Sequence, residues 1–269
     1  MPIIKAVVSD FDGTLAIHHN VPPEVQSVLT SFCKTSGIHF SITTGRAFEG
    51  VVAHVCDILN LSDLHIVRGG AEIYSRLKKS VVWGKYISFD DVQVVLNHLI
   101  TIKDLYYVVE QGEVLYSQTG KPHDEFGHGV SYGLLSKLPH APTPKIFIPP
   151  FQDPILVQPL YDTLKKKFPH LHIIRTSSSR GLGIDINEGS AGKHAALLAY
   201  SHITGIDRKN ILAVGDSYND FPLLEASGVK VAMGNAGPDL QSIADYVVRP
   251  VHDNGMIDVL NIVKKLNNS

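Results

Sequence analysis

Acidic side chains follow two apolar segments of the sequence, one near each end of the chain. Asp10 and Asp12 follow the first segment, and Asp216 and Asp220 follow the segment at residues 210–215. In open α/β sheets, ligands bind at the carboxyl ends of the strands, so carboxylates at strand ends are candidates for one site. Four carboxylates at one edge repel one another unless a cation lies among them. A hard divalent cation with oxygen ligands suits such a set, and we expect Mg²⁺.

Hydroxyl and basic side chains add to these candidates. Thr43 and Thr44 end another apolar run, and Arg46 follows them closely. Lys193 stands where a helix is expected to begin, and a positive charge at that position opposes the helix dipole. An anionic partner therefore makes better sense of Lys193 than exposure to solvent does.

The segments that must position these side chains alternate between strand and helix. Nearly continuous apolar runs predict buried strands, and helical periodicity after Pro22-Pro23 and at residues 48–61 predicts helices. The strands are expected at residues 3–9, 38–43, 65–67, 210–215, 230–233 and 246–248. This alternation predicts an α/β fold with a doubly wound, parallel, Rossmann-like sheet.

The pattern changes between the early and the late strands. Two strand-like segments that flank Gln111-Gly112 predict a hairpin. Further strands are expected at residues 145–148 and 171–175, and helices near residues 89–102 and 154–168. We therefore predict an inserted α+β domain. The expected domain limits are residues 1–85 and 184–269 for the two parts of the core and residues 86–183 for the insertion.

Composition limits the class of protein. The chain has 269 residues, enough for one or two domains, and a formal net charge of −2. This charge argues against a nucleic-acid footprint over the whole chain, and the apolar runs are too short to span a membrane. Cys33 and Cys56 lie in helix-like segments, which suits a reduced protein. We expect a cytoplasmic monomer or small homo-oligomer with neither a nucleic-acid nor a membrane partner.

Four motifs, in order along the chain, resemble those of the haloacid dehalogenase superfamily. Asp10-Phe11-Asp12-Gly13-Thr14-Leu15 resembles the first motif, Thr44 the second, Lys193 the third, and Gly215-Asp216-Ser217-Tyr218-Asn219-Asp220 the fourth. Thr44-Gly45-Arg46 and the fourth motif are similar to the Cof-type branch, whose cap domain is inserted between the second and third motifs. The resemblance covers the whole chain. One departure is Arg68-Gly69-Gly70-Ala71, where Cof-like members usually carry Asn-Gly-Ala.

The resemblance implies a Mg²⁺-dependent phosphatase that forms an aspartyl-phosphate. Asp10 would be the nucleophile, and Asp12 would be the general acid and then the general base. An Asp at the second position favours hydrolysis over a long-lived phosphoenzyme. Asp10, the backbone carbonyl of Asp12 and Asp216 would hold the metal ion, and Asp220 would orient or join its ligand shell.

Further residues are implied to bind a small phosphorylated metabolite, expected to be a sugar or polyol phosphate. Thr44 would hydrogen-bond a phosphoryl oxygen, and Lys193 would offset the negative charge of the phosphoryl group and Asp10. For Arg46, a contact with the substrate phosphate and a surface ion pair remain alternatives, and Asn219 would hold either the phosphate or Lys193. A phosphomutase that uses the same nucleophile and a non-catalytic phosphometabolite sensor remain alternatives.

Polar residues of the insertion are candidates for choosing the substrate, because an inserted domain beside an active edge can close over it. The candidates are His123, Asp124, Arg175, Ser177, Ser178 and Arg180. Ser177-Ser178-Ser179 lacks the context of a nucleophile elbow and is expected to be a loop.

Two other motifs fit their sequence patterns poorly. In a phosphate-binding P-loop, Gly would stand at Asn187 and Ser or Thr at His194. The histidines of residues 123–128 do not match a zinc-protease pattern.

Overall fold

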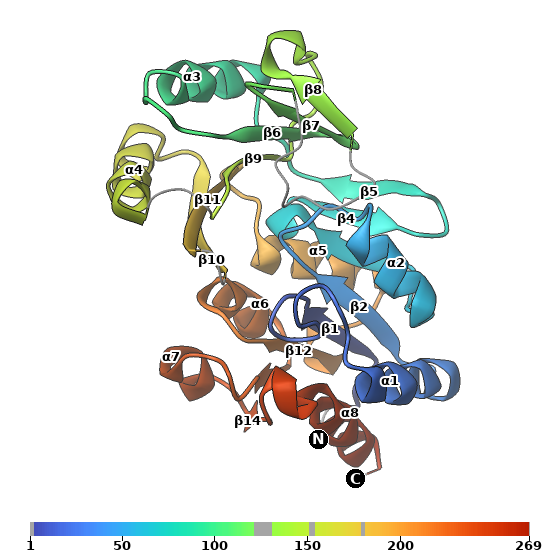
Figure 1. Ribbon diagram of the computed structural model, residues 1–269. Coiled ribbons are helices and arrows are strands. Elements are labelled where there is room, and N and C mark those ends of the chain that lie inside the picture. The colour runs from blue at the N-terminus through green and yellow to red at the C-terminus, as the bar shows by residue number, and fades with distance from the viewer. Residues whose placement is uncertain (1–2, 121–130, 151–153, 179–180, 269) are drawn as a thin grey trace. The chain divides into compact units, whose positions relative to one another are not determined.

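The computed structural model describes residues 3–120, 131–150, 154–178 and 181–268. These residues form two compact units, each with its own sheet (Figure 1). The first unit comprises residues 1–83 and 193–269, and the second comprises residues 84–192. The second unit runs past residue 183 because the strand at Gly181–Asn187 pairs with neighbours in the second sheet.

The first unit contains an eight-stranded sheet in the order β14-β13-β12-β1-β2-β3-β4-β5. Its strands are β1 (Ala6–Asp10), β2 (His39–Thr43), β3 (Leu64–Val67), β4 (Glu72–Ser75), β5 (Ser80–Gly84), β12 (Ile211–Gly215), β13 (Val229–Ala232) and β14 (Tyr246–Val247). The strands from β14 to β3 are parallel, whereas β4 runs antiparallel to β3. The six predicted strands are confirmed, and β4 and β5 extend the sheet beyond them.

Helices cover both faces of this sheet, so the predicted doubly wound core is confirmed. The helices are α1 (Pro23–Thr35), α2 (Val51–Ile58), α5 (Lys193–Thr204), α6 (Phe221–Ala226), α7 (Pro238–Ser242) and α8 (Gly255–Asn267). Apolar side chains of α1, α2 and α8 form one core cluster with the sheet, and those of α5, α6 and α7 form another. Short 3-10 turns lie at Arg68–Gly70 (η1), Arg208–Asn210 (η3), Tyr218–Asp220 (η4) and Val251–Asp253 (η5).

Burial explains why the first strand reads as a continuous apolar run. Every residue of β1 is buried, because β2 and β12 pair with its two edges and helices cover its two faces. A strand in this position has no solvent-facing side on which polar residues would alternate.

The second unit contains a six-stranded sheet in the order β10-β11-β9-β6-β7-β8. Its strands are β6 (Val108–Gln111), β7 (Val114–Ser117), β8 (Ser131–Leu134), β9 (Lys145–Ile148), β10 (His172–Ser178) and β11 (Gly181–Asn187). Helices α3 (Phe89–Leu99) and α4 (Pro154–Lys167) supply apolar side chains to its core, and a 3-10 turn lies at Leu135–Lys137 (η2). The predicted hairpin is β6–β7, and its turn falls at residues 112–113, because Gln111 pairs with Val114.

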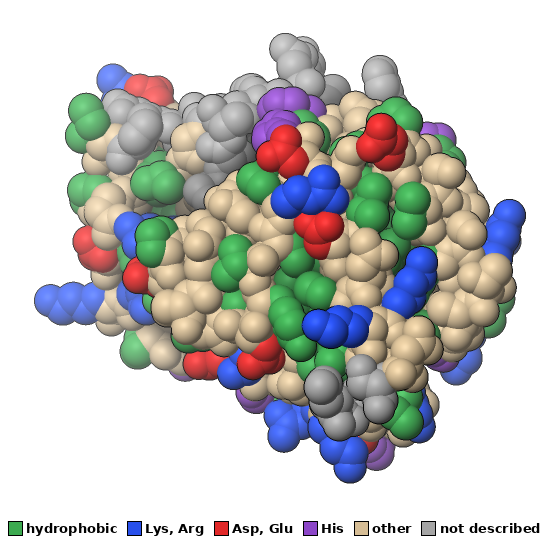
Figure 2. Space-filling view, turned by 90° about the horizontal axis from the view of Figure 1, so that it is seen from below, with side chains coloured by type: hydrophobic (Ala, Val, Ile, Leu, Met, Phe, Trp, Pro, Cys, Tyr) green, Lys and Arg blue, Asp and Glu red, His purple; other side chains and the backbone are tan. Residues whose placement is uncertain are grey.

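Among the described helices, none is both long and apolar enough to cross a membrane. On the face drawn in Figure 2, acidic and basic side chains are interspersed among apolar and neutral ones.

Candidate functional site

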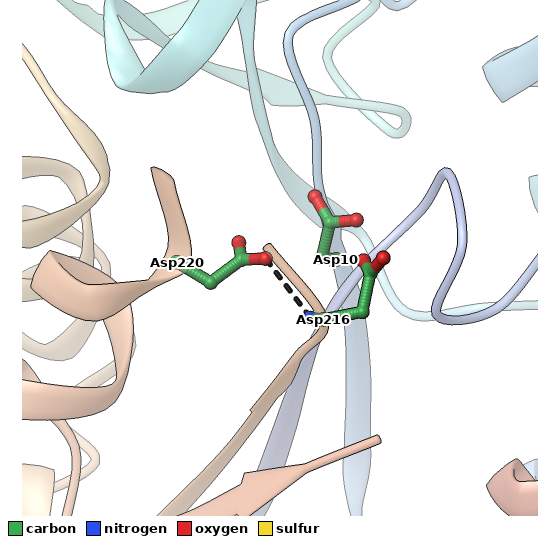
Figure 3. A group of neighbouring side chains, drawn as sticks. All are labelled: Asp10, Asp216 and Asp220. Atoms are coloured by element: carbon green, nitrogen blue, oxygen red, sulfur yellow. Dashed lines mark hydrogen bonds between the residues drawn. The ribbon is translucent and has the colours of Figure 1, made fainter. Parts of the chain in front are cut away.

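The carboxyl ends of β1 and β12 bring three carboxylates together. Asp10 is the last residue of β1, Asp216 follows β12 directly, and Asp220 ends the 3-10 turn η4. Each of the three offers an oxygen that lies within 4.8 Å of the other two. The carboxylates of Asp10 and Asp216 lie close together, and Asp220 approaches them from another side (Figure 3).

Lys193 joins two of these carboxylates. Its Nζ donates to Asp10 Oδ1 at 2.7 Å and to Asp220 Oδ1 at 2.6 Å. All three side chains are buried. Lys193 begins α5, where its positive charge opposes the helix dipole, and these two carboxylates are the anionic partners expected for it.

Backbone groups hold Asp220 in place. Its Oδ2 accepts a hydrogen bond from the backbone N–H of Asp216 at 3.1 Å (Figure 3). It also accepts one from the backbone N–H of Ser217 at 3.0 Å. A side chain on Gly215 would collide with Asp220, since its Cβ would lie 2.5 Å from the Asp220 Cβ. The glycine at the end of β12 therefore makes room for this carboxylate.

Neighbouring polar groups orient Asp216. Thr14 Oγ1 donates to Asp216 Oδ1 at 2.8 Å, and Asn235 Nδ2 donates to Asp216 Oδ2 at 3.3 Å. Asn235 also donates to the carbonyl of Gly13 at 2.9 Å. Gly13 has φ +86°, and a Cβ there would lie 2.4 Å from Asp216 Oδ2, so this turn requires glycine.

Burial and mutual repulsion disturb the titration of the cluster. Burial raises the pKa of Asp10 well above its usual range, and the nearby Asp220 raises it further, although Lys193 acts in the opposite direction. Burial and then Asp220 raise the pKa of Asp216 to about 6. For Lys193, burial alone would lower the pKa, but Asp10 and Asp220 outweigh burial and the net pKa is raised.

These residues fit a divalent cation. The cluster holds three carboxylates and one ammonium group, which pairs with two of them, so the fully ionised cluster carries an excess of negative charge. After burial, the charge of Asp220 is the next cause that raises the pKa values of Asp10 and Asp216. Carboxylate oxygens are the ligands that Mg²⁺ takes in proteins, and a bound cation would relieve the repulsion.

Asp12 lies outside the group of three carboxylates and pairs with Arg46. Arg46 Nε donates to Asp12 Oδ2 at 2.8 Å, and its second nitrogen donates to Asp12 Oδ1 at 2.7 Å. This bidentate geometry fixes the plane of the carboxylate. Half of the Asp12 side chain is exposed, so solvent or a ligand can reach it.

Thr44 and Asn219 differ in what holds them. Thr44 is buried just beyond β2, its N–H donates to the carbonyl of Ile66 at 3.0 Å, and its Oγ1 accepts from the N–H of Arg46 at 3.2 Å. Asn219 Oδ1 accepts from Ser217 Oγ at 2.6 Å. Asn219 is thus engaged within its own turn, and its contact with a substrate stays a prediction.

Asn235 is a part of the site that the sequence analysis missed. It follows β13 in Met233-Gly234-Asn235, so it too lies beyond the carboxyl end of a parallel strand. Its Oδ1 accepts from the N–H of Val251 at 2.9 Å, which fixes the amide while its nitrogen contacts Asp216. The polar residue after Gly234, directly beyond an apolar run, is the feature of the sequence that could have indicated Asn235.

Some of the polar residues predicted to choose the substrate lie outside the described residues, and others belong to β10. His123, Asp124 and Arg180 lie outside the described residues, as do the other residues of 123–128. Ser177 and Ser178 belong to β10, where they pair with Leu182 and Gly181, so the loop expected at residues 177–179 is wrong for these two positions. A run of serines carries no strong strand signal, and the pairing with β11 decides the structure.

Arg175, the remaining candidate of the insertion, contacts α4. One of its guanidinium nitrogens donates to Gln158 Oε1 at 2.5 Å, and the group lies 5.3 Å from the centre of the Tyr161 ring. Its side chain therefore already has partners within the second unit.

The sequence as a whole matches one family of enzymes. A family model of haloacid dehalogenase-like hydrolases matches residues 7–260. Phosphatase YwpJ of Bacillus subtilis is 28% identical to this chain over 288 aligned positions, which cover 96% of this chain and 99% of YwpJ. The 5-amino-6-(5-phospho-D-ribitylamino)uracil phosphatase YcsE of the same bacterium is 24% identical over 249 positions, which cover 91% of this chain and 89% of YcsE.

Solved structures share the fold. A haloacid dehalogenase-like hydrolase from Bacteroides thetaiotaomicron matches with a TM-score of 0.80 and 20% identity, over 98% of this chain and 99% of that one. A sugar phosphatase of subclass IIB of the same superfamily matches with a TM-score of 0.78 and 19% identity, over 96% and 98% of the two chains. The chain therefore belongs to the haloacid dehalogenase-like hydrolases, the family that its four motifs predicted, and is a hydrolase.

Proposed function

We propose that this hydrolase is a Mg²⁺-dependent phosphatase of a small phosphomonoester. The observation that carries the proposal is the pair of short contacts from Lys193 to Asp10 and Asp220, beside Asp216. In this proposal Asp10 is the nucleophile, Lys193 supplies a positive charge, and the carboxylates beside it would bind the metal ion. Phosphoryl transfer through an aspartyl-phosphate uses a carboxylate nucleophile, and positive charge and metal ions stabilise the transferring group.

In the first step, a carboxylate oxygen of Asp10 attacks phosphorus and the bond from phosphorus to the leaving oxygen breaks. Asp12, in its protonated form, gives its proton to the departing alkoxide. Because the ionised Asp12 holds both donors of Arg46, protonation requires that it give up at least one of these hydrogen bonds. The products of this step are the free alcohol and an aspartyl-phosphate on Asp10.

In the second step, water attacks the phosphorus of the aspartyl-phosphate. Asp12, now ionised, takes the proton from that water, and the bond between phosphorus and Asp10 breaks. Inorganic phosphate leaves and both carboxyl groups return to their starting states. Lys193 donates hydrogen bonds to the negative charge in both steps, and the hydroxyl of Thr44, a buried residue, would hydrogen-bond a phosphoryl oxygen.

Asp10, Asp216 and the backbone carbonyl of Asp12 would hold the metal ion, with Asp220 orienting this set through the N–H of Asp216. Bound there, Mg²⁺ would neutralise charge on the transferring group. Arg46 would release part of its hold on Asp12 to contact the substrate phosphate.

The names of two related proteins support a sugar or polyol phosphate as the substrate. YcsE is named for a phosphorylated ribitylamino compound, and one structural neighbour is named a sugar phosphatase. The second unit would act as the cap that selects the leaving group. Cys33 and Cys56 are both free thiols, which supports a reducing compartment such as the cytoplasm. We place the enzyme there as a monomer or small homo-oligomer.

The proposal is tested by phosphate release from p-nitrophenyl phosphate and then from a panel of sugar and polyol phosphates. We expect turnover by the parent with Mg²⁺, none with EDTA, and none by Asp10→Asn. Turnover that survives Asp10→Asn would show that the nucleophile is wrongly assigned. A folded parent that releases no phosphate from any compound of the panel, but isomerises a sugar phosphate when a bisphosphate activator is added, would indicate a phosphomutase.

A further inference from the structure

A buried arginine lies directly after β3, in the turn η1. Arg68 has 2% of its surface exposed and is among the largest fully buried side chains of the described residues. Its φ is +53°, a region in which residues other than glycine are uncommon. Arginine is almost never fully buried unless it is paired, so the partners of Arg68 show what it does.

Two carboxylates from different segments neutralise this guanidinium. One nitrogen makes a short ion pair with Glu72, a buried residue of β4. The other lies 3.5 Å from Oε2 of Glu49, which is half-buried. Glu49 belongs to the segment at residues 44–50, which leads from β2 to α2. The forked guanidinium therefore ties this segment to β4 through its two nitrogens.

The backbone of the same turn holds the other end of that segment. The N–H of Arg68 donates to the carbonyl of Arg46 at 2.8 Å, and the N–H of Gly69 donates to the carbonyl of Thr44 at 2.9 Å. These bonds continue the contact between β2 and β3 beyond the named strands. Arg68 thus fixes the segment that carries Thr44 and Arg46 both by its main chain and by its side chain.

The segment that Arg68 holds leads directly to the candidate acid and base. Arg46 leaves this paired backbone and reaches both oxygens of Asp12 at 2.8 and 2.7 Å. A shift of the segment would move the guanidinium of Arg46, and with it the carboxylate that it orients.

We propose that Arg68 is a positioning residue. Together with Glu49 and Glu72 it sets the position of Thr44 and Arg46, and through Arg46 the orientation of Asp12. Its side chain is enclosed by protein and acts through these residues. A buried ion pair is weak support for stability, because apolar side chains of similar volume can replace one without loss. Only the expected effect on kcat and KM rests on the proposed phosphatase function; the positioning of Arg46 by this cluster does not.

The test uses the double variant Arg68→Met/Glu72→Met, which removes both charges of the short ion pair and keeps only the half-buried Glu49 of this cluster. It is compared with the parent, with Arg46→Met, and with the triple variant that combines all three substitutions. Arg76→Met is the control, because Arg76 is another ion-paired arginine of the first unit, half-buried where Arg68 is buried. It pairs with Asp57 at 2.6 Å and donates to the carbonyl of Leu61, outside the segment at residues 44–50.

Two readouts are measured on each full-length variant. The first is kcat and KM for p-nitrophenyl phosphate with Mg²⁺. The second is the ¹⁵N NMR signal of the Arg46 Nε–H, assigned by its absence in Arg46→Met and independent of any turnover. If Arg68→Met/Glu72→Met does not fold, Arg68→Lys takes its place, since it keeps Glu72 paired but cannot reach both carboxylates with two nitrogens.

We expect the double variant to lose kcat by about tenfold to hundredfold, as a misplacement of about 1 Å does in active sites. KM should rise as well, because Thr44 and Arg46 would contact the substrate phosphate, and the Arg46 Nε–H signal should shift or broaden. In the Arg46→Met background the same substitutions should lower kcat less than in the parent, because only the part of the effect that acts through Thr44 remains. Arg76→Met should leave both readouts unchanged.

Other results would overturn the inference. An unchanged Arg46 signal would show that Arg68 does not position Arg46. An equal loss of kcat with and without Arg46 would show that it acts by another route. A parent that hydrolyses no phosphate ester would contradict the proposed function instead, and the Arg46 signal would still decide whether Arg68 positions that residue.

Discussion

Replacing Lys193 by Met should destabilise the first unit in a way that depends on pH. The ammonium group lies 2.7 Å from Asp10 and 2.6 Å from Asp220, and all three side chains are buried. At an effective dielectric constant of about 20, each such contact corresponds to about 6 kcal/mol, which the cost of burying the ions partly offsets. Removing one partner of a buried ion pair costs about 3 to 5 kcal/mol, and we expect a loss of that size.

The loss should grow as the pH rises. Without Lys193, the repulsion between Asp10 and Asp220 is relieved only by binding a proton, so the pKa of Asp10, already raised by burial and Asp220, should rise further. A carboxyl group whose pKa is higher in the folded than in the unfolded state contributes stability at low pH and loses it as the pH rises. The destabilisation by Lys193→Met should therefore be smaller at about pH 5.5 than at about pH 8.

Urea unfolding in EDTA measures this effect. Trp83, the single tryptophan of the chain, lies in β5 within the first unit, so its fluorescence reports on the unit that contains the site. Lys209→Met is the control, because Lys209 pairs with Asp207 at the surface, and its loss should change stability by less than about 0.5 kcal/mol. A Lys193→Met protein as stable as the parent at about pH 8, or one that gains stability relative to the parent as the pH rises, would refute the reasoning.

Three further predictions concern other residues of the first unit. Burial lowers the pKa of His65 to about 3, so the stability that neutral His65 contributes is complete above about pH 6.5 and is lost towards pH 3. Between about pH 7.5 and 5, the free energy of unfolding in urea should fall by about 2 kcal/mol more for the parent than for His65→Gln. Equal losses in the two proteins would contradict this prediction. Mg²⁺ at about 100 times its Kd should stabilise the parent by about 2.7 kcal/mol in thermal unfolding, whereas Asp216→Asn should respond weakly; an equal response would exclude Asp216 as a ligand. Thr43 Oγ1 is buried without a hydrogen-bond partner among the described residues, so Thr43→Val should unfold at an equal or higher urea concentration, and a loss above about 1 kcal/mol would show that the hydroxyl has a partner.

The sequence allowed the core of the site to be predicted because its geometry is local to strand ends. Buried parallel strands read as apolar runs, and Asp10 and Asp216 stand at the ends of two runs that the fold makes neighbours. Which strands pair is not visible in the runs themselves. The order of the motifs along the chain supplied that information, through the family that they resemble.

Other features of the site depend on contacts that spacing does not reveal. Asn235 reaches Asp216 only because its own oxygen is fixed by the N–H of Val251, a residue from a later turn. The burial of Arg68 depends on Glu49 and Glu72, which come from different segments. A charged residue after a strand is expected to face solvent, and only the positions of its partners reverse that expectation.

Strand pairing also set limits on what could be predicted in the second unit. β8 pairs with β7 in parallel, and the strand includes a glycine, Gly133. Short polar strands of this kind carry weak propensity and form because a neighbouring edge offers hydrogen bonds.

The central claim is that Asp10 carries the phosphoryl group during turnover. The most direct measurement is mass spectrometry of the protein quenched in acid during turnover of p-nitrophenyl phosphate with Mg²⁺. We predict a peptide heavier by one phosphoryl group, with the modification on Asp10, and none in Asp10→Asn or in EDTA. Phosphate release by the parent with no modified Asp10 at any quench time, or with the phosphoryl group on another residue, would contradict the account.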